Sequence, residues 1–112
     1  DYYRSAIAYI SGKVPDAIFF VFSDDIEWVK RNYTFLPKAT KYVIHNEDPS
    51  DCIDISLMRK CRHNIIANST FSWWGAFLGE QKNKIVIAPR NWYNNKPDFI
   101  LRDLIPSEWI LI

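Results

Sequence analysis

The sequence predicts an α/β fold in which helices flank a Rossmann-like parallel sheet. The chain has 112 residues, of which 48% are hydrophobic and 24% are charged, and these values are typical of one globular domain. Short apolar runs alternate with segments of helical period along most of the chain. Each run is apolar on both faces, as strands between two layers of helices must be. We therefore expect residues 1–112 to form a single α/β domain.

The apolar runs define the predicted strands. They are rich in β-branched and aromatic residues and are too short for buried helices. The predicted strands are residues 17–22, 42–45, 64–67 and 84–88, with a last short strand at residues 109–112.

Between these strands, apolar residues recur at the helical period. The predicted helices are residues 2–13, 24–33, 50–61 and 70–81. This alternation implies right-handed crossovers and a doubly wound sheet. The first helix starts with neither an initiator Met nor a leading cap, so we expect the chain to be a segment of a longer protein.

Composition and motifs exclude several classes of function. The 14 basic and 13 acidic residues give a net charge of +1, which disfavours nucleic acid as a partner. None of the three glycines, Gly12, Gly75 and Gly79, belongs to a dinucleotide-binding fingerprint or a P-loop. No apolar run has the roughly 18 residues that a membrane helix needs, so a soluble protein is expected. Cys52 and Cys61 lie about 13 Å apart along one predicted helix, too far for a disulfide, and favour a reducing compartment.

The carboxyl ends of the predicted strands are the expected ligand-binding edge. After the third strand, five consecutive polar or aromatic residues open a helix: Asn68, Ser69, Thr70, Phe71 and Ser72. Their hydroxyls and the free N–H groups of the first helical turn could hold a phosphate. The alternative is that Ser69 or Thr70 only caps the helix.

Asp54 is the second candidate, because it shares a helical stripe with Leu57, Met58 and Cys61. A carboxylate on an apolar face needs a cation or strong donors. A structural salt bridge would satisfy it. A ligand edge with two parallel N–H donors, such as guanine, would do so too.

The remaining acidic residues and histidines point to structure. Asp24 and Glu27 have the spacing of an acidic capping box at a helix start, and Asp25 also suits that position. The Asp24–Asp25 pair lacks an Asp-x-Asp spacing, and His45 and His63 are isolated in the sequence. No metal site is predicted.

Several motifs together resemble the C-terminal half of bacterial α-1,2-fucosyltransferases, glycosyltransferase family eleven. They are FSDDIEW at residues 22–28, DISLM at 54–58, CRHNIIANSTFSWWGA at 61–76 and KIVIAP at 84–89. The resemblance covers nearly the whole chain.

The resemblance implies the nucleotide-sugar-binding half of a GT-B-like enzyme that transfers fucose from GDP-fucose, with inversion, to the 2-hydroxyl of a galactoside. It implies no metal and no cofactor. Asp54 would read the guanine, and Ser69, Thr70 and Phe71 would hold the diphosphate, flanked by Asn68 and Ser72. No catalytic residue is assigned to this half.

The implied partners are GDP-fucose, a galactoside acceptor and a missing N-terminal half. The implied location is the cytoplasm, with peripheral contact at the inner face of the bacterial membrane as an alternative.

One departure from the family is clear, because its His-x-Arg-Arg-x-Asp motif does not occur in these residues. It would lie upstream of Tyr2, and we therefore expect this chain alone to be inactive. Two other functions stay open on the residues: a receiver-like signalling module with an acidic pair after an early strand, and a non-catalytic α/β interaction domain.

Overall fold

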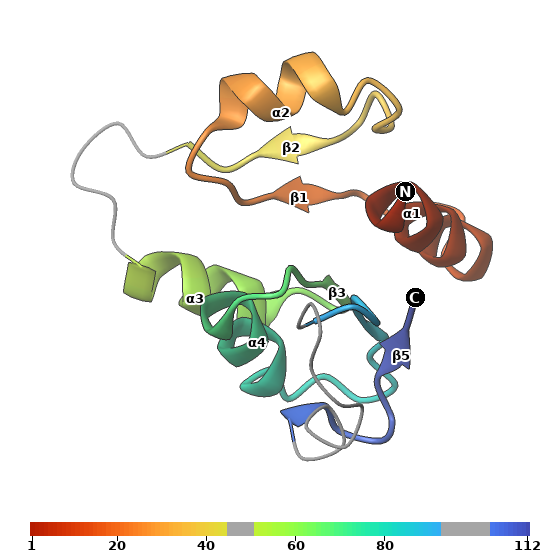
Figure 1. Ribbon diagram of the computed structural model, residues 1–112, viewed down its shortest axis with the longest axis vertical. Helices are drawn as coiled ribbons and strands as arrows, with labels where there is room; N and C mark the ends of the chain where they lie inside the picture. Colours follow the sequence, from red (N-terminus) through yellow and green to blue (C-terminus); the bar gives the residue numbers. More distant parts are fainter. Residues whose placement is uncertain (45–50, 93–103) are drawn as a thin grey trace.

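The computed structural model describes residues 1–44, 51–92 and 104–112, without the side chains of Asp51 and Cys52. It is a small α/β domain (Figure 1). The helices are α1 (Tyr2–Lys13), α2 (Ile26–Asn32), α3 (Asp51–Lys60) and α4 (Thr70–Phe77). The strands are β1 (Phe20–Val21), β2 (Lys41–Tyr42), β3 (Asn64–Ile65), β4 (Val86–Ala88) and β5 (Ile110–Leu111).

All described strand pairs are parallel, as predicted, but they form two sheets instead of one. One sheet contains β1 and β2, and the other has the order β3-β4-β5. The division falls between β1 and β3, which lie apart in Figure 1. It arises because β1 makes its ladder hydrogen bonds to β2 alone and β3 makes its ladder bonds to β4 alone.

The three-stranded sheet lies between two apolar layers. Ala6 and Ile10 of α1 pack with Ile87 on one face. Because alternate residues of a strand face opposite sides, the neighbours of Ile87 face a second cluster. That cluster contains Ile66, Ala76, Val86, Ala88, Trp92, Ile105 and Trp109. This half of the molecule therefore has the layered core that the sequence predicts.

Helix caps differ from the sequence-based expectations at two N-termini. Asp1 is the N-cap of α1, and its side chain accepts a 2.9 Å hydrogen bond from the backbone N–H of Tyr3, so the expectation of an uncapped start was wrong. Asp25, not Asp24, caps α2 by accepting from the N–H of Trp28 at 2.9 Å. The Ser23 hydroxyl in turn accepts from the N–H of Asp25 at 3.1 Å, which fixes the turn one residue later than the capping box predicts.

The last predicted strand is confirmed as β5, whereas the predicted helix at residues 70–81 ends at Phe77. Residues 45–50, including His45, and residues 93–103 of the C-terminal tail lie outside the described residues. Over the described part of the chain, no helix combines the length and apolar character needed to cross a membrane.

Candidate functional site

A cavity of about 1420 Å³ lies between the two sheets. Its walls include residues of β1 and β3 and of the segments that follow them. Four of the six predicted site residues line it: Asp54, Ser69, Phe71 and Ser72. Asn68 and Thr70 are exposed and are not among its lining residues. The structure thus brings a carboxylate of α3 and the start of α4 to one cavity, although the two helices are separate in sequence.

Ser69 is the N-cap of α4, as the alternative interpretation of this junction expects. Its hydroxyl accepts from the backbone N–H of Ser72 at 3.2 Å and lies 2.7 Å from the Ser72 hydroxyl. The Ser72 hydroxyl also lies within hydrogen-bond distance of the carbonyl oxygens of Ala67 (3.1 Å) and Ser69 (3.2 Å). Both serine hydroxyls are therefore engaged within the loop.

Thr70 and Phe71 supply the groups that remain open to a ligand. They are the first two residues of α4, so their backbone N–H groups have no carbonyl one helical turn earlier. The positive end of the helix dipole adds to the attraction for an anion. The side-chain amide of Asn68 reaches the Trp92 carbonyl at 3.5 Å and holds the loop to the segment after β4.

Asp54 lies on the half-buried face of α3 towards the cavity. The stripe that it shares with Leu57 and Met58 is only partly covered, because Met58 is buried while Leu57 is exposed. Part of the predicted apolar face of α3 therefore forms a wall of the cavity.

Other lining residues were not singled out as binding residues from the sequence. Ser23 and Asp24 follow β1 and line the same cavity. The rule that ligands lie beyond the carboxyl ends of strands nominates this junction, although the residues there favour helix capping over binding. Asp24 has no capping role, since Asp25 performs it.

His63 also lines the cavity, and its Nδ1 accepts a 2.8 Å hydrogen bond from the backbone N–H of Ile85. Burial and the neighbouring Arg62 charge lower the pKa of His63. The Cys61 thiol is free, and burial raises its pKa.

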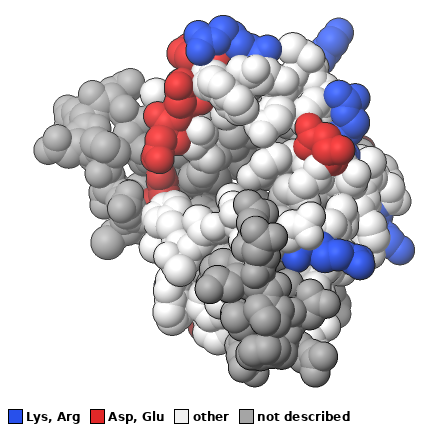
Figure 2. Space-filling model, in the orientation of Figure 1, with Lys and Arg blue, Asp and Glu red and all other residues white. Residues whose placement is uncertain are grey.

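Figure 2 shows a band of acidic side chains at the upper left of the face in view, and the cavity lining contains residues of both signs, among them Asp24, Asp54, Lys60 and Arg62. Basic side chains are scattered over the same face. Among the described residues, no group of three His, Cys, Asp or Glu side chains could hold a metal ion.

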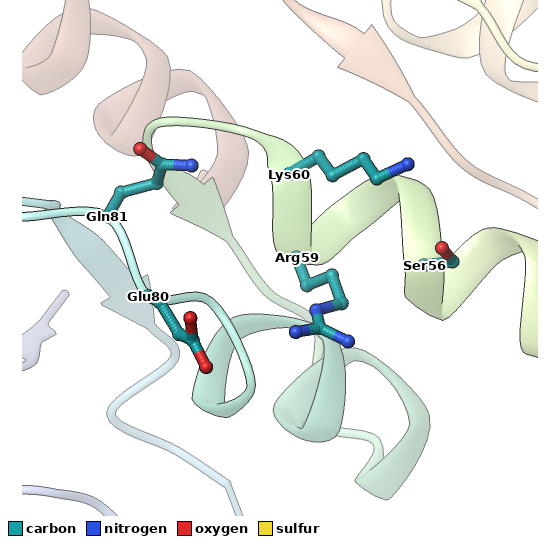
Figure 3. A pocket seen from close by; sticks show the side chains of 5 residues that line it. All are labelled: Ser56, Arg59, Lys60, Glu80 and Gln81. Atoms are coloured by element: carbon teal, nitrogen blue, oxygen red, sulfur yellow. The ribbon is translucent and has the colours of Figure 1, made fainter.

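A second, smaller hollow of about 320 Å³ lies where the end of α3 meets the segment after α4. It is lined by Ser56, Arg59, Lys60, Glu80 and Gln81 (Figure 3). Arg59 and Lys60 point in different directions (Figure 3). These side chains do not converge on one point, so the larger cavity is the better candidate site.

Comparison with known proteins identifies the family. The sequence model described as Glycosyl transferase family 11 matches residues 1–112. The chain is 46% identical, over 86% of its length, to the O-antigen biosynthesis glycosyltransferase WbnK of Escherichia coli, and 37% identical, over 99%, to an alpha-1,2-colitosyltransferase of Escherichia coli. It is 26% identical, over 69% of its length, to human galactoside alpha-(1,2)-fucosyltransferase 1.

These matches cover 32%, 38% and 21% of the respective relatives, so the chain spans about a third of the length of the two bacterial proteins. No solved structure is significantly similar to it. The match along its whole length shows that the chain belongs to glycosyl transferase family 11.

Proposed function

We propose that this chain is the donor-nucleotide-binding half of a GT-B-like glycosyltransferase. The intact enzyme transfers fucose, or a closely related deoxysugar, from its GDP-linked donor to the 2-hydroxyl of a galactoside with inversion. The names of the relatives, a colitosyltransferase and a fucosyltransferase, support this class of donor sugar. The observation that carries the proposal is the shared cavity, lined by Asp54 and by the first turn of α4.

In this proposal Asp54 accepts two hydrogen bonds from the guanine edge. The diphosphate lies at the N-terminus of α4, where the N–H groups of Thr70 and Phe71 and the Thr70 hydroxyl donate to it. Ser69 and Ser72 then act by shaping the loop, because their hydroxyls already bond to each other. Asn68 positions the loop through its contact with the Trp92 carbonyl. No metal or cofactor is part of this arrangement.

Because the whole chain matches a glycosyltransferase family, this proposal takes the place of the receiver-like signalling module that the residues left open. The non-catalytic alternative predicts that the cavity has lost nucleotide binding, so a binding measurement distinguishes the two. As part of the same proposal, the protein works in the cytoplasm, where a reducing environment keeps the Cys61 thiol free.

Titration calorimetry of the 112-residue chain with GDP, ADP and UDP tests the proposal. We expect GDP to bind at least about tenfold more tightly than the other two nucleotides, because hydrogen bonds to a charged group contribute about 1.5–3 kcal/mol. Asp54→Asn should abolish this preference. Asp16→Asn is the matched control, since Asp16 lines the same cavity and the substitution removes the same charge. Equal affinities for the three nucleotides would remove the assignment.

The diphosphate contact has its own test. Thr70→Val keeps the shape of the side chain but removes its hydroxyl, so it should weaken GDP binding and leave guanosine binding unchanged. Ser69→Asn keeps a cap-forming side chain. It should bind GDP like the unmodified chain if Ser69 only shapes the loop. We also propose that the chain alone transfers no sugar, because it contains no His-x-Arg-Arg-x-Asp sequence. Turnover of GDP-fucose by the chain alone would contradict that.

A further inference from the structure

Three aromatic residues form one connected cluster in the lining of the large cavity. Tyr3 of α1, Trp28 of α2 and Tyr33, which follows α2, make up this aromatic wall. The ring centroids of Tyr3 and Tyr33 are 5.5 Å apart, and those of Trp28 and Tyr33 are 5.4 Å apart. The Trp28 and Tyr33 rings meet edge to face at 86°, so they do not cover each other flat. Aromatic surface from two helices therefore borders the cavity.

Trp28 is the most open part of the aromatic wall. It is 45% exposed, whereas its neighbour Val29 is buried and anchors α2 to the fold. The backbone of Trp28 is held on both sides, because its N–H donates to the Asp25 carboxylate at 2.9 Å and its carbonyl accepts from the Asn32 amide at 2.8 Å. A large exposed ring on a fixed backbone contributes little to the core and is well suited to contact a ligand.

Further contacts hold the aromatic wall in place. Tyr33 is 5.4 Å from Phe35, and the Arg4 guanidinium lies 4.6 Å from the centroid of the Phe35 ring. The backbone N–H of Tyr33 also donates to the Val29 carbonyl at 2.8 Å. A surface that is already ordered loses little conformational freedom when a ligand binds.

Hydrogen-bonding groups border the aromatic wall. Asp24 precedes Trp28 by about one helical turn and lines the same cavity. Its exposed carboxylate makes no hydrogen bond or ion pair with the rest of the described chain. The Ser23 hydroxyl accepts from the Asp25 N–H at 3.1 Å, so its own O–H is still able to donate. The wall thus combines aromatic surface with a free acceptor and a free donor.

This combination fits a sugar ring. A pyranose stacks its C–H bonds on aromatic faces, while the hydroxyls at its rim bond to carboxylates and other hydroxyls. In a β-galactoside, the axial 4-hydroxyl leaves the C–H bonds of C3, C4 and C5 together on one face of the ring. We propose that the aromatic wall, with Asp24 and Ser23, binds the galactoside acceptor. The identity of this sugar rests on the proposed function.

The placement of the aromatic wall suits an acceptor. In Figure 1, α2 lies on one side of the molecule and α3 and α4 lie on the other. All three helices contribute residues to the cavity lining. The galactoside and the nucleotide would therefore be held by different walls of one cavity, as a transfer between two bound substrates requires.

An NMR titration of the 112-residue chain with methyl β-D-galactopyranoside, in the absence of nucleotide, tests this site. We expect the indole N–H signal of Trp28 to shift, with a dissociation constant in the millimolar range. The indole N–H of Trp74 is the internal reference, since Trp74 is similarly exposed, at 47%, but is not among the cavity-lining residues. Absence of a Trp28 shift at about 100 mM galactoside, where even a weak site would fill, would overturn the proposal.

A second sugar tests the stacking geometry. Methyl β-D-glucopyranoside differs from the galactoside only in the orientation of its 4-hydroxyl, so it should bind less tightly. Equal affinity for the two sugars would contradict the proposal. A Trp28 shift with methyl α-L-fucopyranoside and none with the galactoside would assign the wall to the donor sugar, and would also overturn it.

Variants separate stacking from hydrogen bonding. With binding followed at the backbone amide of Asp24, Trp28→Ala should lower the galactoside affinity at least about tenfold, and Trp74→Ala should leave it unchanged. Asp24→Asn keeps the size of the side chain but removes its charge, so it should also weaken binding. Equal galactoside affinities of Trp28→Ala and Trp74→Ala, or an unchanged affinity in Asp24→Asn, would contradict the assignment.

Calorimetry with GDP distinguishes failure of this proposal from failure of the proposed function. GDP binding without galactoside binding would overturn the aromatic wall alone. Galactoside binding without GDP binding would support the wall and remove the nucleotide site at Asp54 and α4. Weaker GDP binding in Trp28→Ala would show that the wall stacks the base, and would overturn its assignment to a sugar.

Discussion

Gly75 of α4 lies directly against Met58 of α3. A Cβ atom added to Gly75 would lie 2.9 Å from Met58 Cβ, 3.0 Å from its Cε and 3.1 Å from its Sδ. Gly75 and Met58 are both buried. The absence of a side chain at residue 75 therefore sets how closely α3 and α4 can pack, and with it the position of Asp54 relative to the start of α4.

Gly75→Ala should destabilise the chain by about 1–3 kcal/mol, the usual range for overpacking a core. Met58→Ala should not rescue it fully, because the nearest atom is the Met58 Cβ, which alanine retains. Urea unfolding followed by circular dichroism measures both variants.

Gly12→Ala is the matched control for this prediction. Gly12 is also helical, but an added Cβ would meet nothing within 4 Å. Alanine there should stabilise the chain by about 0.5–1 kcal/mol through helix propensity. A loss of stability of the same size in both glycine variants would show that packing against Met58 is not the cause.

Local sequence patterns predicted the elements whose stability is local. Within the predicted strand at residues 84–88, the structure forms β4 at Val86–Ala88, whose three residues are buried, and the apolar period located the four helices of the described residues. The division of the sheet was not predictable, because which edge pairs with which depends on contacts distant in sequence. Asp54 and Ser69 were chosen on separate arguments, and only folding shows that they line one cavity.

Helix α4 ends earlier than predicted because of polar contacts, which the pattern of apolar residues cannot reveal. The Lys84 ammonium donates to the carbonyls of Ala76 at 2.6 Å and Gly79 at 2.7 Å, which lie at and beyond the end of the helix. Asn83, in the turn before it, adopts a positive φ of 59°, a conformation that asparagine tolerates well. These contacts stop α4 at Phe77, whereas the sequence predicted a helix to residue 81.

Lys84→Met should therefore destabilise the chain by about 1–3 kcal/mol, because it leaves the carbonyls of Ala76 and Gly79 without their charged donor. Lys82→Met is the control. It removes the same charge two residues away, and Lys82 is exposed. Thermal unfolding of the two variants measures the difference. Equal melting temperatures would show that the capping contacts contribute nothing.

Tyr2 connects α1 to the three-stranded sheet through its hydroxyl, which lies 2.6 Å from the carbonyl oxygen of Ile66 and 3.0 Å from that of Ile87. Burial is the main cause that raises the pKa of Tyr2, and the neighbouring Tyr3 adds to it. Tyr2→Phe should cost about 1–2 kcal/mol, because it removes the donor and keeps the ring. Tyr9→Phe is the control, since Tyr9 is exposed. Chemical denaturation of both variants tests this, and an effect of equal size in the two would contradict it.

His63 makes the stability of the β3–β4 pair sensitive to acid. Its Nδ1 must be unprotonated to accept from the Ile85 N–H, and its folded-state pKa lies below the usual value. A group with a lowered pKa in the folded state contributes its full stabilisation above the unfolded-state pKa of about 6.5, and this contribution is lost as the pH falls through the lowered value. Since the ring is partly exposed, we expect the loss to stay under about 1 kcal/mol.

His63→Asn isolates this effect, because the asparagine carbonyl can accept from the same N–H but does not titrate. The free energy of unfolding, measured by urea denaturation at pH 7.5 and at pH 5, should fall for the unmodified chain by more than it does for His63→Asn. Carboxylates elsewhere titrate alike in both proteins, so the difference between the two pH dependences belongs to His63. Equal falls in the free energy of unfolding of the two proteins between pH 7.5 and pH 5 would contradict this prediction. They would show that the Ile85 contact does not oppose protonation of His63.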